Sequence, residues 1–244
     1  MLLKEFKADL HIHTCLSPCA DAQMLPDRIV QQARLKSLDI IGICDHNSTE
    51  NVLAVKAAGK KAGLLVLGGM EISSQEEVHI MGFFSDDQSL RLMQEVVYKN
   101  LPGENKETVF GEQLVADEHG KIIGTNSRLL IGSVNLGLER VVALIKSLGG
   151  IAIASHINRQ TFGIIGQMGF IPPGLGLDAL EVTAEYSLSE IAEYEKYNLP
   201  LVKFSDAHFL QDIGSASTVF SLKALEFSEI NLALGSVEGR KVKI

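Results

Sequence analysis

The chain is predicted to be an α/β protein, because two kinds of segment alternate along it. Short runs rich in Val, Ile and Leu are separated by segments whose apolar residues recur at helical spacing. Several runs are almost continuously apolar, as expected for strands of a parallel sheet buried on both faces. Strands alternating with helices form such a sheet, open or closed. The predicted strands are 7–11, 39–44, 64–68, 78–84, 150–155, 177–182, 200–204 and, in addition, 216–222.

The helical segments lie between these strands. Pro26 stands near the first turn of one of them, where its missing N–H costs little. Asn47 followed by Glu50 has the pattern of a capping box, so we expect the next helix to begin at Asn47. The predicted helices are 26–36, 47–61, 90–100, 137–148 and 187–197.

Two segments do not fit the alternation. Residues 101–135 are rich in glycine and are predicted to form an excursion with one hairpin around Glu118, His119 and Gly120. Residues 160–176 are irregular and apolar. Long loops of α/β enzymes are often lids or binding loops, although a packing loop fits equally well. We otherwise expect one domain over residues 1–244.

Composition and charge restrict the class of partner. The 244 residues are 46 % hydrophobic and 21 % charged, which is ordinary for a globular protein. The net charge of −8 disfavours binding of duplex nucleic acid by bulk electrostatics, and the lack of Trp disfavours stacking of single strands. Three cysteines are too few for a disulfide framework. With no signal-peptide pattern and no apolar run near the roughly 18 residues of a membrane span, we expect a cytoplasmic protein without membrane contact.

Histidines are concentrated at the ends of the predicted strands. Only His119 of the seven lies elsewhere, and acidic residues accompany the other six. Because parallel strands bring their carboxyl ends to one face, these side chains are expected to converge. Their N and O donors suit Zn, Mn or Fe, so we predict a metal site, although any single strand-end His is more often only hydrogen-bonded. The six histidines are His11, His13, His46, His79, His156 and His208, and the acidic residues are Asp9, Asp45, Glu71 and Asp206.

The neighbours of these histidines are expected to have lesser roles. Asp9 and Asp45 each precede a His on a strand and would point away from it, so we expect them to orient ligands and not to bind metal. Cys15 and Cys19 are four residues apart, which is a weak metal pattern. A turn packed by small thiols explains them equally well, but Cys19 or Asp21 could complete a site.

In these motifs the chain resembles the PHP (polymerase and histidinol phosphatase) superfamily. The four motifs, in the family's order, are Asp-Leu-His-Ile-His-Thr at 9–14, Cys-Asp-His-Asn-Ser at 44–48, Ser-His at 155–156 and Ser-Asp-Ala-His at 205–208. The resemblance implies a distorted (β/α)7 barrel, similar to the TIM barrel, with a metal cluster, usually of three ions, at the C-terminal ends of the strands. It also implies a stand-alone metal-dependent phosphoesterase.

The resemblance further implies three sets of ligands. The first ion would be held by His11, His13, Glu71 and Asp206. The second would be held by Glu71, which bridges, and by His79 and His156. The third would be held by His46 and His208 with one ligand from the turn after the first motif. The family has His or Asp at the position of Pro18 or Cys19, so the third site would use the Cys19 thiolate, Asp21 or neither.

A phosphoesterase with two to three divalent ions (Zn, Mn or Fe) is therefore the leading functional prediction. Two bridged ions would lower the pKa of a shared water, and the resulting hydroxide would attack phosphorus. Glu71 and Asp206 would serve this centre, and His208 would stabilise the leaving oxygen. Arg159 is a candidate phosphate clamp, because guanidinium pairs with phosphate bidentately, although it is equally compatible with an exposed surface residue.

Two other functions are compatible with the motifs. Metal-dependent amidohydrolases also begin with His-x-His but commonly bridge their metals with a modified Lys, whereas here Glu71 has that place and Lys203 lies inside a predicted strand. A non-catalytic metal-binding PHP module is the second alternative, although the main motifs are all present. For a phosphoesterase the expected substrate is a small phosphorylated metabolite or nucleotide, as monoester or diester; longer nucleic acid is possible but not favoured.

Overall fold

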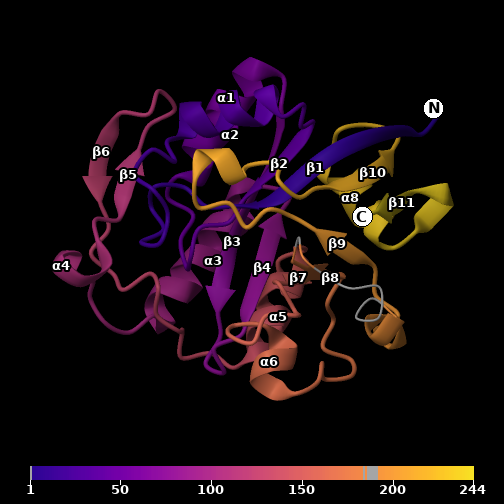
Figure 1. The fold of residues 1–244 in the computed structure, drawn as a ribbon. Coiled ribbons are helices and arrows are strands. Elements are labelled where there is room, and N and C mark those ends of the chain that lie inside the picture. The colour runs from indigo at the N-terminus through magenta and orange to yellow at the C-terminus, as the bar shows by residue number, and fades with distance from the viewer. Residues whose placement is uncertain (1, 184, 186–191) are drawn as a thin grey trace.

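The computed structural model describes residues 2–183, 185 and 192–244, and its main feature is a nearly closed barrel (Figure 1). A nine-stranded sheet has the order β11-β10-β1-β2-β3-β4-β7-β8-β9. The strands from β1 to β9 in this order are the seven of the expected distorted (β/α)7 barrel, which is confirmed. The strands are β1 (Lys4–Ile12), β2 (Ile40–Ile43), β3 (Leu65–Ser73), β4 (His79–Phe84), β7 (Ile151–Ala154), β8 (Ala179–Val182), β9 (Leu201–Lys203), β10 (Thr218–Leu222) and β11 (Lys241–Lys243).

Helices cover the outside of the barrel (Figure 1). Among the described residues, none of them is both long and apolar enough to span a membrane. The helices are α1 (Pro26–Leu35), α2 (Val52–Ala62), α3 (Asp87–Asn100), α4 (Glu107–Phe110), α5 (Leu138–Ser147), α6 (Ile164–Met168) and α8 (Phe227–Leu234), with the 3-10 turns η1 (Glu195–Tyr197), η2 (Leu210–Asp212) and η3 (Val237–Gly239). The helix predicted over 187–197 lies partly outside the described residues, which include 192–197 and in which the last three residues form η1.

The start predicted for the second helix is wrong. α2 begins at Val52, because the Asn47 side chain does not cap a helix. Asn47 has a left-handed φ of 50°, and its amide donates to the carbonyl oxygens of Leu130 and Gly132 at 2.8 and 2.7 Å. Asn47 therefore ties the end of β2 to the excursion.

The excursion contains the predicted hairpin. β5 (Leu114–Ala116) and β6 (Ile122–Thr125) pair antiparallel beside the barrel, as Figure 1 shows at the edge of the molecule. Gln113 joins the two ends of this hairpin, since the Gln113 amide donates to the carbonyl oxygens of Asn126 and Arg128 at 2.7 and 2.6 Å.

One barrel strand runs against the predicted parallel direction. β4 is antiparallel to both of its neighbours, β3 and β7. Only residues 74–78 connect β3 to β4, and a parallel crossover needs a dozen or more residues. The first residue of β4, His79, therefore lies beside the last residue of β3, Ser73, at the same mouth of the barrel as the carboxyl ends of the parallel strands.

The barrel closes where the chain after β9 meets β1. The end of β1 pairs with Ala207: the N–H of His13 donates to the Ala207 carbonyl and the N–H of Ala207 donates to the His11 carbonyl, both at 3.0 Å. The Thr218 hydroxyl of β10 accepts from the N–H of Lys203 at 2.8 Å and donates to its carbonyl at 3.0 Å. This closure brings the last of the four motifs beside the first.

A register shift in β1 allows this strand to place apolar side chains in the barrel core and histidines at the barrel mouth. Ala8 and Leu10 belong to the barrel core, so simple alternation would direct His11 and His13 outward. The pairing of β1 with β2 shifts just before Ile12, and such a bulge changes the face that later side chains occupy. The core side chains include Ala8, Leu10, Ile40, Leu67, Met81, Phe83, Ile153, Val202 and Phe220.

Gly42 in β2 provides space for this core. A Cβ at this position would overlap the carbonyl oxygen of Leu10 and lie 2.8 Å from the ring of Phe83. Phe83 is fully buried and is among the largest side chains of the interior.

We expect Gly42→Ala to lower the free energy of unfolding by roughly 1–3 kcal/mol, because the added methyl group overpacks the core. Equilibrium urea unfolding measures this difference. Gly124→Ala in β6 is the matched control, since a Cβ there meets no atom within 4 Å. Equal unfolding free energies for the two variants would contradict the prediction.

Candidate metal centre

Glu71 lies at the centre of the barrel mouth. Alternation along β3 directs Leu67, Gly69 and Glu71 to the inside, and the Glu71 side chain is 1 % exposed. Five imidazoles from four segments surround its carboxylate. The distances from the carboxylate oxygens are 3.3 Å to His11 Nε2, 3.5 Å to His13 Nε2, 3.2 Å to His46 Nδ1, 3.2 Å to His79 Nδ1 and 3.4 Å to His156 Nε2.

Asp206 and His208 complete this group from the segment after β9. Asp206 Oδ1 lies 3.2 Å from His11 Nε2 and 3.3 Å from His13 Nε2. His208 stacks on His13 with ring centroids 4.3 Å apart, and its Nδ1–H donates to the backbone carbonyl of Asp206 at 2.8 Å. The structure thus brings together the six strand-end histidines with Glu71 and Asp206.

Strained backbone turns the strand ends into the mouth. Asn47, His156 and Asp206, each just after a strand, have positive φ values of 50°, 28° and 49°. Such conformations cost about 1–3 kcal/mol each and concentrate at functional sites. At His156 and Asp206 the reversal accompanies side chains that contact the central carboxylates or imidazoles.

The electrostatic state of these groups suits metal binding. Burial acts to raise the pKa of Glu71, but the neighbouring His79 and His11 hold it well below its usual range. Burial, together with the charge of His208, lowers the pKa of His13 to about 4, and burial with the charge of His13 lowers that of His46 well below its usual range. Burial acts to lower the pKa of His11, but Glu181 and Asp206 hold it well above its usual range. Ionised carboxylates and neutral imidazoles are the forms that bind divalent ions, so an ion bound at His11 would take the place of a proton.

The donor atoms fit such ions. Several buried nitrogen and oxygen atoms of this group have no hydrogen-bond partner in the part of the chain that the structure describes: His11 Nε2, His13 Nε2, Glu71 Oε1, His79 Nδ1 and His156 Nδ1. Buried polar atoms are normally paired, so these atoms suit a positively charged ligand. Three sets have donor atoms within 4.8 Å of one another: His11, His13 and Glu71; His46, Glu71 and His79; and His13, His46 and His208.

Asp9 and Asp45 lie behind this group, facing away from it. Asp45 accepts from the Ser17 hydroxyl at 2.7 Å, and Ser17 Oγ lies 3.0 Å from Nδ1 of His13. Asp9 accepts from the Ser205 hydroxyl at 2.6 Å and from the Gly214 N–H at 2.8 Å. Each carboxylate therefore fixes loop segments next to the proposed ligands.

Glu181 is a residue of the site that sequence reasoning missed. It lies on β8, is buried, and its carboxylate oxygens are 2.9 and 3.0 Å from Nδ1 of His11. It was overlooked because it lies inside a strand and not at its end. Its signal was a lone acidic residue at an inward-facing position of an otherwise apolar strand.

The turn after the first motif lies at the rim. Cys19 is exposed and lines a cavity of about 190 Å³ with the histidines, but it belongs to none of the three sets of close donors. Asp21 instead stabilises its own turn, accepting from the Gln23 N–H at 2.7 Å. Ile131 of the excursion and Phe162 of the 160–176 loop also line the cavity, and the Phe162 ring stacks on His79.

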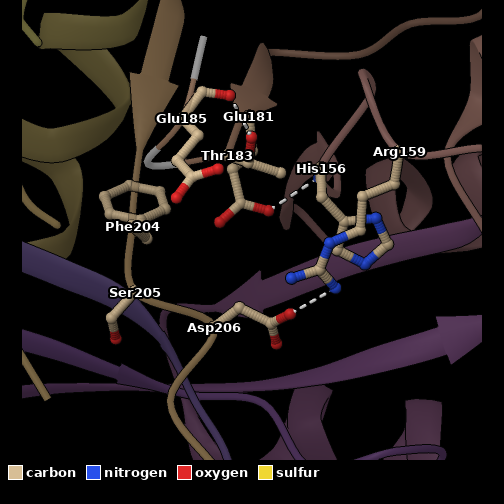
Figure 2. Close-up of a pocket in the computed structure, with 8 residues that line it drawn as sticks. All are labelled: His156, Arg159, Glu181, Thr183, Glu185, Phe204, Ser205 and Asp206. Carbon is tan, nitrogen blue, oxygen red and sulfur yellow. Dashed lines mark hydrogen bonds and ion pairs between the residues drawn. The ribbon is translucent and has the colours of Figure 1, made fainter. Parts of the chain in front are cut away.

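Arg159 separates this cavity from a second one. Its guanidinium pairs with Asp206 Oδ2 at 2.6 Å, and its side chain is 45 % exposed. Figure 2 shows the second pocket, of about 340 Å³, with Arg159 and Asp206 on one side and Thr183 and Glu185 on the other. The two cavities share His156, Arg159 and Asp206 in their linings, so they adjoin at the proposed metal centre.

Curated proteins match the chain over limited regions. A 5'-3' exoribonuclease of Haemophilus influenzae is 30 % identical over 83 residues, which are 33 % of this chain and 29 % of the enzyme. A phosphoribosyl 1,2-cyclic phosphate 1,2-diphosphodiesterase of Eggerthella lenta is 28 % identical over 79 residues, which are 30 % of this chain and 29 % of the enzyme. The matched region is thus less than a third of either relative.

A solved structure and two family models extend the comparison. The lesion-specific endonuclease PfuEndoQ of Pyrococcus furiosus has the same fold, with a TM-score of 0.72 at 19 % identity over 98 % of this chain and 58 % of the endonuclease. The PHP-associated family model matches residues 190–233. The PHP domain model matches residues 9–147, more than half of the chain and including the first two motifs and Glu71. The resemblance seen in the motifs is confirmed, and the protein belongs to the PHP domain family.

Proposed function

We propose that this protein is a metal-dependent phosphoesterase that hydrolyses the phosphate ester of a small metabolite or a nucleotide. The observation that carries the proposal is the gathering of five imidazoles within 3.5 Å of the buried Glu71 carboxylate. Family membership supports it, as do the two curated relatives, an exoribonuclease and a cyclic-phosphate diphosphodiesterase, whose names describe cleavage of phosphate esters.

Two to three divalent ions are proposed to bind here. Glu71 would bridge two of them, with His11, His13 and Asp206 on one side and His79 and His156 on the other. His46 and His208 would hold a further ion at the rim, with Cys19 as the candidate for an additional ligand. Bound ions of this kind activate water and neutralise phosphate oxygens.

The surrounding residues would then position the substrate. Arg159 lies at the junction of the two cavities, where its guanidinium can exchange its contact with Asp206 for the phosphate. His208 has a side chain 22 % exposed at the rim, where it can donate a hydrogen bond to the leaving oxygen.

The size of the site favours small substrates. The metal cavity encloses about 190 Å³ and the adjoining pocket about 340 Å³, which together fit a phosphate with a nucleoside-sized group. The net charge of −8 disfavours long nucleic acid. Because the fold is shared with a lesion-specific endonuclease, a short nucleic acid is the second candidate.

We expect the purified protein to contain two to three ions per chain by ICP-MS and to hydrolyse members of a panel of phosphomonoesters and phosphodiesters with Mn or Zn. The ratio of monoester to diester turnover would separate a phosphatase from a nuclease. Bound ions with turnover of lactams or carboxylic esters but not phosphates would instead indicate an amidohydrolase. Ions without any turnover would indicate a non-catalytic module.

Glu71→Gln is expected to reduce phosphoesterase turnover at least about 100-fold and to lower the metal content, because the neutral amide cannot bridge two cations. ICP-MS and steady-state kinetics measure both effects. Glu95→Gln, at an exposed position of α3, is the control and should resemble the wild type. Retained turnover in Glu71→Gln would refute the assigned role.

Arg159→Met is expected to raise KM for a phosphate ester at least about 10-fold while the metal content stays unchanged, since a charge-assisted bond to phosphate contributes about 1.5–3 kcal/mol. Arg140→Met on the exposed face of α5 is the matched control. An unchanged KM would mean that Arg159 serves only its ion pair with Asp206.

A further inference from the structure

Glu181 is a buried carboxylate outside the proposed set of metal ligands. It lies between Leu180 and Val182 on β8, and its side chain is 2 % exposed. Burying a carboxylate in such surroundings costs several kcal/mol unless hydrogen bonds compensate. It belongs to none of the sets of close donor atoms found among the described residues. Its polar contacts must therefore account for its presence.

Those contacts link two of the proposed ligand segments. The carboxylate accepts from Nδ1–H of His11, on β1, at 2.9 Å and from the backbone N–H of His156, after β7, at 2.8 Å. Figure 2 shows the Glu181 carboxylate pointing to the His156 backbone. The bond to His156 holds a residue whose φ of 28° is strained, so Glu181 also fixes the turn that carries this imidazole.

The other histidine of the first motif is held in the same way. The Ser17 hydroxyl donates its one proton to Asp45, so it accepts from Nδ1–H of His13 at 3.0 Å. Both His11 and His13 are thus bound at Nδ1 from behind, and the Nε2 atoms of both are buried without a hydrogen-bond partner in the described structure. Two unrelated sets of side chains produce one orientation, which argues against a chance contact.

We propose that Glu181 is a positioning residue of the metal centre: it binds Nδ1–H of His11, so that Nε2 of the ring faces Glu71 and Asp206, and it fixes His11 and His156 relative to each other. The inference rests on the metal centre of the proposed function, but not on the identity of the substrate. A carboxylate behind a ligating imidazole fixes the ring and raises its basicity.

The test compares Glu181→Gln with the wild type in metal binding. Both carboxylate oxygens of Glu181 lie within 3.0 Å of Nδ1 of His11, so a glutamine places its donating NH₂ against Nδ1–H or turns it toward the N–H of His156, and it also removes the negative charge. We expect the affinity for Mn or Zn, measured by competition with a chelator in the absence of substrate, to fall 10–100-fold. Glu185→Gln is the matched control, because Glu185 lines the pocket in Figure 2 but is exposed, and its affinity should be that of the wild type.

A second measurement does not depend on the variant folding. Long-range ¹H–¹⁵N NMR of the metal-free wild type should show a proton on Nδ1 of His11, the atom that faces Glu181. A His11 ring that carries its proton only on Nε2, or a folded Glu181→Gln that binds metal as tightly as the wild type, would overturn the proposal. A wild type that binds metal tightly but hydrolyses no phosphate ester would refute the proposed function and leave this role of Glu181 standing.

Discussion

The contact of one buried carboxylate with five imidazoles is the interaction on which the rest of this molecule depends. Glu71 can be ionised in the barrel only because the surrounding histidines offset the cost of its burial. Within the part of the chain that the structure describes, several buried donor and acceptor atoms of the same group have no hydrogen-bond partner. The barrel mouth is therefore built for positive ions, and its local polarity is set by this cluster and not by the net charge of the chain.

The barrel departs from regular geometry where the cluster requires it. A shift in β1 directs His11 and His13 inward after two core residues, and the antiparallel β4 brings His79 to the mouth. Left-handed backbone at His156 and Asp206 turns the ends of two more strands. Because the rest of the nearly closed barrel packs around a buried core, it can hold these unfavourable conformations.

Side chains outside the proposed ligand set hold the ligands in position through hydrogen bonds. Asp45 acts through Ser17 on His13, Glu181 acts directly on His11, and Asp9 holds the segment before Asp206. The loops that interrupted the α/β alternation also reach the site, since Ile131 and Phe162 line its cavity. They are thus placed to shape the space for a substrate, whereas the ligands come from the rigid strand ends.

The α/β class, the seven barrel strands and the histidines that gather at the mouth can be predicted from the sequence, because apolar runs and strand-end histidines are local patterns. How these elements meet follows from contacts between distant parts of the chain. Whether β4 runs parallel depends on the connection to β3, and the inward direction of His11 depends on a shift in pairing with β2. Where α2 begins depends on bonds from Asn47 to the distant Leu130 and Gly132. Glu181 shows the limit most clearly, since its partners are 170 and 25 residues away along the chain. Such contacts arise only when the barrel closes, and no local pattern of residues specifies them.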